Sequence, residues 1–300
     1  EAAGTVIRGS EITDCLFGIW LHEVTGVQIL DNHVVGRPDV MVHSKGNGIH
    51  LFDSEQLTVR GNTVEGARDG IFVSATEDSL IANNRVTGQR FGIHYMYSYD
   101  NTVEGNTLVD NGGGIALMQS LRLVIRDNVA TGSDRHGILF RDVQYSTITG
   151  NRVEGNTEGL FFFSSLDNVI TNNIIANNQI GARIWAGTER NEIHDNAFVG
   201  NREQVFYVAS ADQTWGANYW SDYLGWDQDG DGLGDRPYRN DALTASLLHA
   251  YPAATLLLNS PGIELLRLLQ QRLPALRVPT VIDEHPLLSP PDLLPAAVSP

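Results

Sequence analysis

A repeat of about 22 residues constrains this 300-residue chain more than any other feature of its sequence. The dipeptide Gly-Ile, or a close variant, recurs at intervals of 30, 22, 22, 22, 23, 22 and 22 residues. A second series, of asparagine with one serine, keeps the same register, and isoleucine or valine stands three residues before each of its members. The two series are Gly18, Gly48, Gly70, Gly92, Gly114, Gly137, Gly159 and Gly181, and Ser10, Asn32, Asn62, Asn84, Asn106, Asn128, Asn151, Asn173 and Asn196.

This period is too short for ankyrin or tetratricopeptide repeats, and it lacks the leucine pattern of leucine-rich repeats. β-branched columns that recur once per period indicate short stacked strands. We therefore predict an all-β fold, a right-handed parallel β-helix with coils of about 22 residues. We expect glycine and asparagine to form left-handed corners between strands, and stacked asparagine side chains to bond from coil to coil.

The repeat fades near residue 210, which divides the chain into a β-helix over 1–210 and a loop-rich, helical extension over 211–300. The first coil begins within a few residues of position 1, so we expect further coils upstream in the native protein. In the extension, Ser260 and Pro261 predict the start of a helix that Pro274 ends. Its apolar residues include Leu265, Leu268 and Leu269, which we expect to bind a partner, and the tail from 274 to 300 should pack or dock.

Composition excludes several classes of protein. The formal net charge is −16, with Lys45 as the single lysine, so a nucleic acid would be repelled. Cys15 is the one cysteine, which excludes an internal disulfide and a cysteine-based zinc site. No apolar run is long enough to span a bilayer, so we expect membrane contact only through a partner.

One face of the β-helix departs from the polar surface that a solvated strand normally shows. Residues two positions apart share a strand face, so the residues flanking the inward isoleucines must point outward. These outward positions hold aromatic, methionine and histidine side chains, which predicts an interaction surface. We call its docking residues the aromatic stripe: Trp20, Phe52, Phe72, Phe161, Phe163 and Trp185.

The same face carries candidate metal ligands. Met96 and Met118 fall in one column of successive coils, and His94 lies two residues from Met96. Thioether and imidazole ligands without a thiolate suit copper, especially transiently bound Cu(I). A second candidate copper cluster comprises Met41, His43 and His50, the first two of which lie in an insertion after Asn32. The alternative for both groups is a protein contact without metal.

An acidic loop follows the β-helix. Asp227, Asp229, Asp231 and Asp235, together with the Leu233 carbonyl, match the ligand spacing of an EF-hand calcium loop, with glycine at the sixth position. The twelfth position is Tyr238 instead of the usual bidentate glutamate. We predict a weak calcium site with a structural role, and an acidic turn without an ion is the alternative.

The coils resemble the carbohydrate-binding and sugar-hydrolase repeat family, which includes pectate-lyase-like folds. More narrowly, nearly the whole chain resembles the NosD family of periplasmic accessory proteins. The motifs that carry this resemblance are the acidic loop, Gly92-Ile93-His94-Tyr95-Met96-Tyr97-Ser98, Ala116-Leu117-Met118, Gly216-Ala217-Asn218-Tyr219-Trp220-Ser221-Asp222 and Leu256-Leu257-Leu258-Asn259-Ser260-Pro261. The family's usual aromatic residue after Met118 is replaced here by Gln119.

The resemblance implies a non-enzymatic, copper-binding periplasmic protein that serves maturation of the copper–sulfur centre of nitrous oxide reductase, NosZ, in denitrification. Its implied partners are an ABC transporter, formed by NosF and NosY, and the copper chaperone NosL.

Two alternatives remain open on the same fold. A polysaccharide lyase or epimerase would need clustered acid, base and arginine side chains. The best candidates are Asp134, Arg135, His136, Arg141 and Asp142, which lie within an apolar face. The other alternative is a scaffold without catalytic function.

Overall fold

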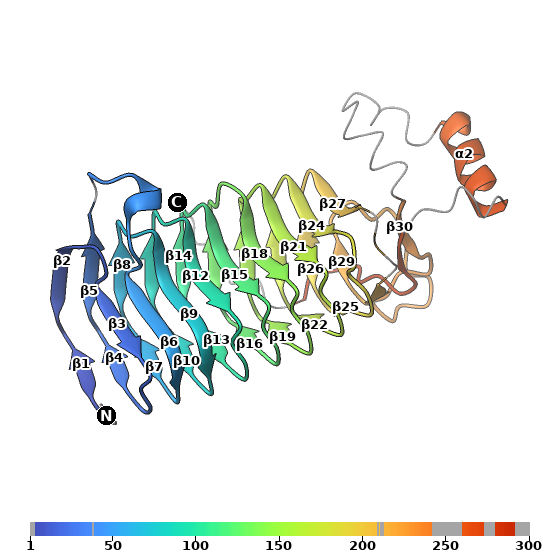
Figure 1. Cartoon of the computed structure of the whole chain (residues 1–300). Coiled ribbons are helices and arrows are strands. Elements are labelled where there is room, and N and C mark those ends of the chain that lie inside the picture. Colours follow the sequence, from blue (N-terminus) through green and yellow to red (C-terminus); the bar gives the residue numbers. More distant parts are fainter. Residues whose placement is uncertain are drawn as a thin grey trace.

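The computed structural model describes residues 4–37, 39–208, 210, 213–241, 260–272 and 280–291. Three long parallel sheets run the length of an elongated stack of coils (Figure 1). The chain is therefore a parallel β-helix of about ten coils with almost no helix, and the predicted fold class is confirmed.

Each coil contributes one short strand to each sheet, and every strand pairs in parallel with the equivalent strand of the next coil. Sheet A contains β1 (Val6–Arg8), β4 (Gln28–Leu30), β7 (Thr58–Arg60), β10 (Leu80–Ala82), β13 (Thr102–Glu104), β16 (Val124–Arg126), β19 (Thr147–Thr149), β22 (Val169–Thr171), β25 (Glu192–His194) and β28 (Thr214–Gly216). Sheet B contains β2 (Glu11–Cys15), β5 (His33–Gly36), β8 (Thr63–Glu65), β11 (Arg85–Thr87), β14 (Thr107–Val109), β17 (Val129–Thr131), β20 (Arg152–Glu154), β23 (Ile174–Ala176), β26 (Ala197–Val199) and β29 (Tyr219–Trp220). Sheet C contains β3 (Ile19–His22), β6 (Ile49–Glu55), β9 (Asp69–Glu77), β12 (Phe91–Met96), β15 (Gly113–Met118), β18 (His136–Arg141), β21 (Glu158–Phe163), β24 (Ile180–Ile184) and β27 (Glu203–Tyr207).

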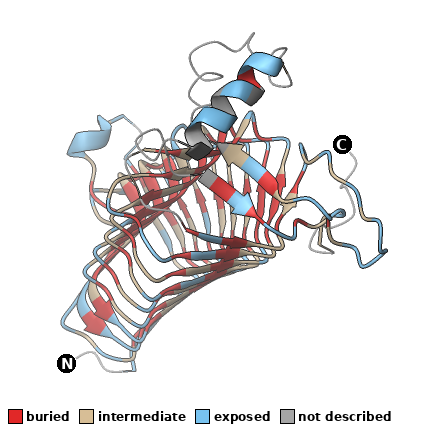
Figure 2. Cartoon of the chain, turned by 90° about the vertical axis from the view of Figure 1, so that its right-hand side faces the viewer, coloured by how far each residue is buried: buried red, intermediate tan, exposed pale blue. Residues whose placement is uncertain are grey.

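The interior is filled by the predicted aliphatic and aromatic columns. Ile93 pairs with Ile71 and Ile115 in the neighbouring coils, and all three are fully buried. Burying such a side chain contributes about 1.5–3 kcal/mol, and the contribution recurs in every coil. Figure 2 shows that buried residues follow the strands of the stack.

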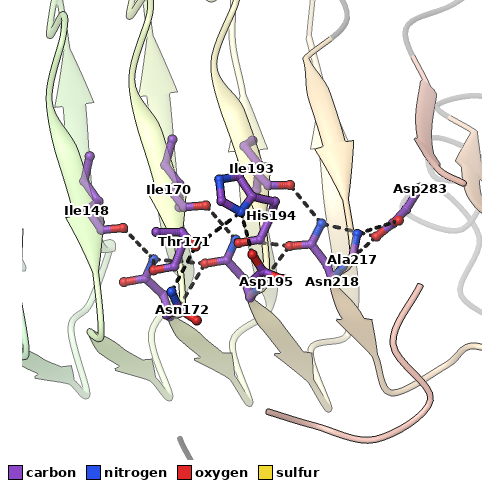
Figure 3. Close-up of polar contacts among 12 residues, drawn as sticks. Ile148, Ile170, Thr171, Asn172, Ile193, His194, Asp195, Ala217, Asn218 and Asp283 are labelled. Carbon is purple, nitrogen blue, oxygen red and sulfur yellow. Dashed lines mark hydrogen bonds and ion pairs between the residues drawn. The ribbon is translucent and has the colours of Figure 1, made fainter. Parts of the chain in front are cut away.

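A ladder of buried asparagines joins the coils at the corner between sheets A and B. Asn128 is typical: its Oδ1 accepts from Asn106 N at 3.0 Å and from Asn106 Nδ2 at 2.9 Å. Its Nδ2 donates to Val103 O and to Asn151 Oδ1, both at 2.9 Å. The predicted coil-to-coil bonding of asparagine is therefore confirmed (Figure 3).

Glycine and asparagine do form left-handed corners, as predicted, but not at the ladder asparagines themselves. The residue before each one takes the positive φ, as at Gly150 (φ 68°) and Asn172 (φ 55°), while the ladder side chain turns inward. The glycine of the Gly-Ile series has a different role. A Cβ at Gly114 would lie 2.5 Å from the Gly137 carbonyl oxygen, so glycine is required there by the close stacking of coils.

The coils continue past residue 210, because β28 and β29 extend sheets A and B. Part of the aromatic segment thus belongs to the last coil, where Trp220 is buried and stacks on Phe198 at 4.5 Å and on Tyr238 at 4.2 Å. A two-stranded antiparallel sheet, β30 (Tyr238–Asp241) and β31 (Thr280–Asp283), follows this coil.

The buried carboxylate of Asp283 ends the asparagine ladder (Figure 3). Its Oδ2 accepts from Asn218 N at 2.8 Å, Asn218 Nδ2 at 3.2 Å and Trp220 Nε1 at 3.1 Å. Its Oδ1 accepts from Ala217 N at 3.0 Å. Asp283 thus supplies the acceptor that the asparagine of a further coil would supply.

The remaining described elements are short. The 3₁₀ turn η1 (Val42–Ser44) lies in the insertion after Asn32. Helix α2 (Pro261–Arg272) starts where the sequence predicts, and Ser260 Oγ accepts from Ile263 N at 3.4 Å. In the parts of the chain that the structure describes, no helix is long and apolar enough to cross a bilayer. Residues 242–259, 273–279 and 292–300, which include parts of the predicted motifs and tail, lie outside the described residues.

We predict that Asn128→Asp strongly destabilises the β-helix. A carboxylate cannot donate to Val103 O or Asn151 Oδ1, so buried acceptors would face a buried charge. The expected loss in the free energy of unfolding is about 3 kcal/mol or more, measurable by urea denaturation.

The matched control is Asn172→Asp, an identical change at an exposed corner where other coils already carry aspartate, as at Asp127. It should leave stability within about 0.5 kcal/mol. Equal effects of the two substitutions would contradict the role given to the ladder.

Candidate metal centre

The outer face of sheet C brings the predicted soft ligands together. Met96 in β12 is the direct strand partner of Met118 in β15. His94 shares the outward face of β12 with Met96, because the two are separated by one residue. The placement of these three side chains on two adjacent strands therefore agrees with the prediction from the sequence.

His94 points outward, yet only 5% of it is exposed. A small apolar cluster on the outside of the sheet covers this region, formed by Phe91, Ala116 and Leu139 with Met118 and Phe161 packed against it. The His94 ring also contacts Phe72 edge-on at 5.0 Å. Met96 and Met118 are half-buried. The site thus has a deep imidazole and two shallower thioethers.

A buried ion pair holds the His94 ring. His94 Nδ1 lies 3.0 Å from Asp69 Oδ2, and Asp69 is fully buried. Arg90 donates to both carboxylate oxygens, from Nε at 2.8 Å and from Nη2 at 2.6 Å. Burial alone would raise the pKa of Asp69, but the hydrogen bonds from His94 and Arg90 bring it below its ordinary value. Asp69 is therefore a carboxylate that accepts from the imidazole.

The other nitrogen of the ring is free. His94 Nε2 is buried and has no hydrogen-bond partner among the described residues. If Nδ1 carries the proton that Asp69 accepts, Nε2 presents a lone pair, as in metal sites where a carboxylate orients the histidine. An unpaired buried nitrogen beside two thioethers fits a soft metal ion such as Cu(I).

Sequence reasoning missed Asp69 and Arg90. The one available signal was an acidic residue directly before Gly70, a position that in the neighbouring coils holds Asn47 or Phe91. Nothing in the spacing showed that His94, in the following coil and 25 residues along the chain, would reach it.

The second predicted cluster is more open. Met41 is 71% exposed, and His43 lies exposed in η1. His50 is engaged elsewhere: its Nδ1 accepts from Asn47 Nδ2 at 3.1 Å, and its ring stacks on Trp20 at 4.4 Å. Burial, aided by Arg68, lowers the pKa of His50.

Another ionic cluster, which the sequence did not predict, lies further along sheet C. His136 Nδ1 is 2.7 Å from Glu158 Oε2, and Arg183 binds the other carboxylate oxygen. Burial would raise the pKa of Glu158, but His136 and Arg183 lower it. The arginines proposed for a lyase do not converge here, since Arg135 lies over the Phe91 ring and Arg141 over the Phe163 ring.

At the N-terminal end of the stack, ligand atoms of His22, Glu23 and Asp53 lie within 4.8 Å of one another. All three residues are exposed, and the sequence analysis had not grouped them. They stand two or three coils from Met96, so they do not belong to the site around His94.

The aromatic stripe differs in exposure along its length. Trp20 is 52% exposed and Phe52 38%, while the other four residues are half-buried. On helix α2, Leu265, Leu268 and Leu269 are all exposed. Both surfaces are accessible to a partner in the described part of the chain.

The acidic loop folds around its own backbone. Carboxylate oxygens of Asp227, Asp229 and Asp231 lie within 4.8 Å of one another. Asp227 Oδ2 accepts from Gly232 N at 2.9 Å, and Asp235 Oδ2 accepts from Gln228 N. The loop is bonded to the segment after β31, because Gly234 N donates to Pro286 O and Leu288 N to Gly232 O. Leu287 N in turn donates to Asn218 O, so the loop is connected to the last coil through residues 286–288.

Comparison with known proteins gives one family. Residues 30–225 match the family model described as "Periplasmic copper-binding protein (NosD)". A protein of Pseudomonas aeruginosa named "Probable ABC transporter binding protein NosD" is 43% identical over 96% of this chain and 71% of its own length. A protein of the same name from Stutzerimonas stutzeri is 40% identical over 91% of this chain and 67% of its own.

Among solved structures, the chain is similar to the A-module of the mannuronan C-5 epimerase AlgE6 of Azotobacter vinelandii, with a TM-score of 0.57 and 15% identity over 65% of this chain and 59% of that one. A mutant of the periplasmic alginate epimerase AlgG gives a TM-score of 0.57 and 18% identity over 71% and 61% of the two chains. At such low identity these likenesses concern the fold alone.

We predict that Glu203, in the last strand of sheet C, makes stability depend on pH. Burial raises its pKa to about 7, and its Oε1 has no hydrogen-bond partner within the described ranges. Because the folded protein favours the neutral form, this stability is fully present below about pH 4.5 and is lost as pH rises through 7. Glu203→Gln should therefore melt above the wild type at pH 8 and close to it at pH 4.

Calorimetric melting at both pH values tests this expectation, with the exposed Glu192→Gln as the matched control. A difference between wild type and Glu203→Gln that is the same at both pH values would contradict it.

Proposed function

This chain belongs to the NosD family of periplasmic copper-binding proteins, and we propose that it binds Cu(I) transiently through His94, Met96 and Met118 for maturation of the copper–sulfur centre of nitrous oxide reductase. The observation that carries the proposal is the buried, unpartnered Nε2 of His94 beside two paired methionines. Leaving such a nitrogen unsatisfied costs about 1–3 kcal/mol, so a ligand is the natural partner.

The ligand chemistry favours the reduced ion. Two thioethers and a neutral imidazole form a soft donor set, which suits Cu(I) better than Zn(II). Three ligands without a thiolate should release the ion readily. The half-buried methionines lie on the open side of the site, so the ion would enter and leave through them.

Transfer then requires a partner on the same face. We propose that the aromatic stripe receives the copper chaperone NosL, and that the exposed leucines of α2 contact the ABC transporter of NosF and NosY. NosZ would be the final acceptor of the copper. Support for the transporter comes from the name of the relatives, "ABC transporter binding protein". The cluster of Met41, His43 and His50 is a secondary candidate for receiving copper.

The proposed role is not enzymatic. Only the fold is shared with the alginate epimerases, and Arg135 and Arg141, the arginines considered for a lyase, lie over separate aromatic rings instead of converging on one substrate position. Turnover of a uronate polymer by the purified chain would favour the alternative of a lyase or epimerase. A chain that binds neither metal nor partner would favour a passive scaffold.

We further propose that Asp227, Asp229, Asp231, Asp235 and the Leu233 carbonyl bind calcium weakly. Their spacing matches a calcium loop, and three of the carboxylates already cluster. Bound calcium would stiffen the loop, which holds the segment that follows Asp283. The role is structural.

Replacing both His94 and Met96 by alanine should lower Cu(I) affinity by about a hundredfold or more, since two of three ligands are lost. Competition with a chromophoric Cu(I) chelator under anaerobic conditions measures this affinity. The control is His33→Ala, a half-exposed histidine paired with Glu65 on sheet B, which should bind Cu(I) as the wild type does. Undiminished affinity of the double variant would place the metal elsewhere, with Met41, His43 and His50 tested next.

Calcium binding is tested on protein stripped of ions. Isothermal calorimetry should show weak binding at millimolar calcium, and Asp229→Asn with Asp231→Asn should abolish it because two ligands are lost. The double variant Asp39→Asn with Asp78→Asn removes the same charge at two exposed positions and should leave calcium binding unchanged. Absence of heat from the wild type would refute the assignment of the loop.

A further inference from the structure

Two arginines and one buried carboxylate lie beside the His94 ring. Asp69 is flanked by Arg90, bound to both its oxygens, and by Arg68, whose Nε lies 4.0 Å from Asp69 Oδ2. One carboxylate and two guanidinium groups leave one net positive charge beside the imidazole. The Nη2 of Arg90 is only 3.4 Å from His94 Nδ1, on the ring whose other nitrogen is the proposed ligand.

We propose that Arg68 and Arg90 determine the charge selectivity of this site, admitting a monovalent metal cation and rejecting divalent ones. The proposal rests on the proposed function, since it concerns the metal bound at His94. It adds a role for residues that are not themselves ligands.

Coulomb repulsion between the arginines and a metal ion increases with the charge of the ion. A fixed positive charge near the metal costs a divalent ion twice what it costs a monovalent one. The Arg90 and Arg68 side chains are 37% and 34% exposed, but Asp69 and His94 between them are buried, so solvent screens this repulsion only in part. A carboxylate left without guanidinium partners would have the opposite effect and attract divalent ions.

Stability does not explain the arrangement. A buried ion pair is weak evidence for stabilisation, because desolvation offsets its attraction. Among the described residues, the other bidentate pairs of an aspartate and an arginine are Asp100 with Arg122 and Asp167 with Arg190, both at more exposed positions. The Arg122 donors lie 2.7 and 2.6 Å from the Asp100 oxygens. That exposed pair has no histidine on its carboxylate in the described structure, so it serves as an internal reference.

The test measures selectivity instead of a single affinity. Arg90→Gln removes one positive charge, so the ratio of Zn(II) affinity to Cu(I) affinity should rise about tenfold or more. Arg68→Gln should act in the same direction with a smaller effect, because it lies further from Asp69. A ratio cancels any loss common to both ions, such as a less well oriented ring. Zn(II) is measured by competition with a zinc indicator, and Cu(I) with a copper chelator.

Two controls separate charge from geometry. Arg90→Lys keeps the charge but not the bidentate contact, and should keep the wild-type ratio. Arg122→Gln removes the same charge from the exposed pair with Asp100, and should leave the ratio unchanged. If Arg90→Gln still binds Cu(I) and its ratio of Zn(II) affinity to Cu(I) affinity equals that of the wild type, the proposal is overturned. A wild-type chain that binds no Cu(I) would instead overturn the proposed function and the selectivity with it.

Discussion

The ladder of buried asparagines is the interaction on which the rest of the structure depends. Each side chain joins three coils, since the amide of Asn128 bonds to residues of the coil before and of the coil after. A slip of one residue would place every interior side chain on the outer face. The ladder prevents such a slip, because its amide groups are buried and satisfied in one register only. Stacking in fixed register then turns a linear repeat into columns.

Stacking in columns brings the metal-binding candidates and the charged side chains of the outer face together. Met96 and Met118 meet because they are strand partners, and His94 meets Asp69 because the ring reaches diagonally to the preceding coil. Strands hold these groups more rigidly than loops would, and the fold therefore supplies the preorganisation that a weak site needs. The same register places apolar neighbours over the imidazole, which withdraws it from solvent.

Much of this was predictable from the sequence, because the period of 22 and the alternation of faces are exact enough to assign columns. The period and the alternation predicted the inward residues, the common face of the proposed metal ligands and the coil-to-coil asparagine bonds. Glycine and asparagine corners were also predicted, but not that each corner lies one residue before a ladder asparagine, since spacing cannot separate a ladder position from the turn beside it. The burial of His94 and its contact with Asp69 could not be predicted from the sequence, because both depend on the directions of side chains between coils. Phe91, for example, covers His94 only because Gly113 leaves room for its ring: a Cβ there would lie 2.8 Å from Phe91 Cδ1.

The end of the ladder has the same physical requirement as its middle. The donors of Asn218 and Trp220 would lack acceptors after the last coil, and Asp283 satisfies them from 65 residues further along the chain. A single carboxylate holds this distant segment only if the backbone around it is fixed, and the acidic loop bonds to residues 286–288 just beyond it. Loop and cap therefore act as one unit. This couples the proposed calcium site to the stability of the terminal coil, while the proposed copper ligands, several coils away, are supported by their own section of the ladder.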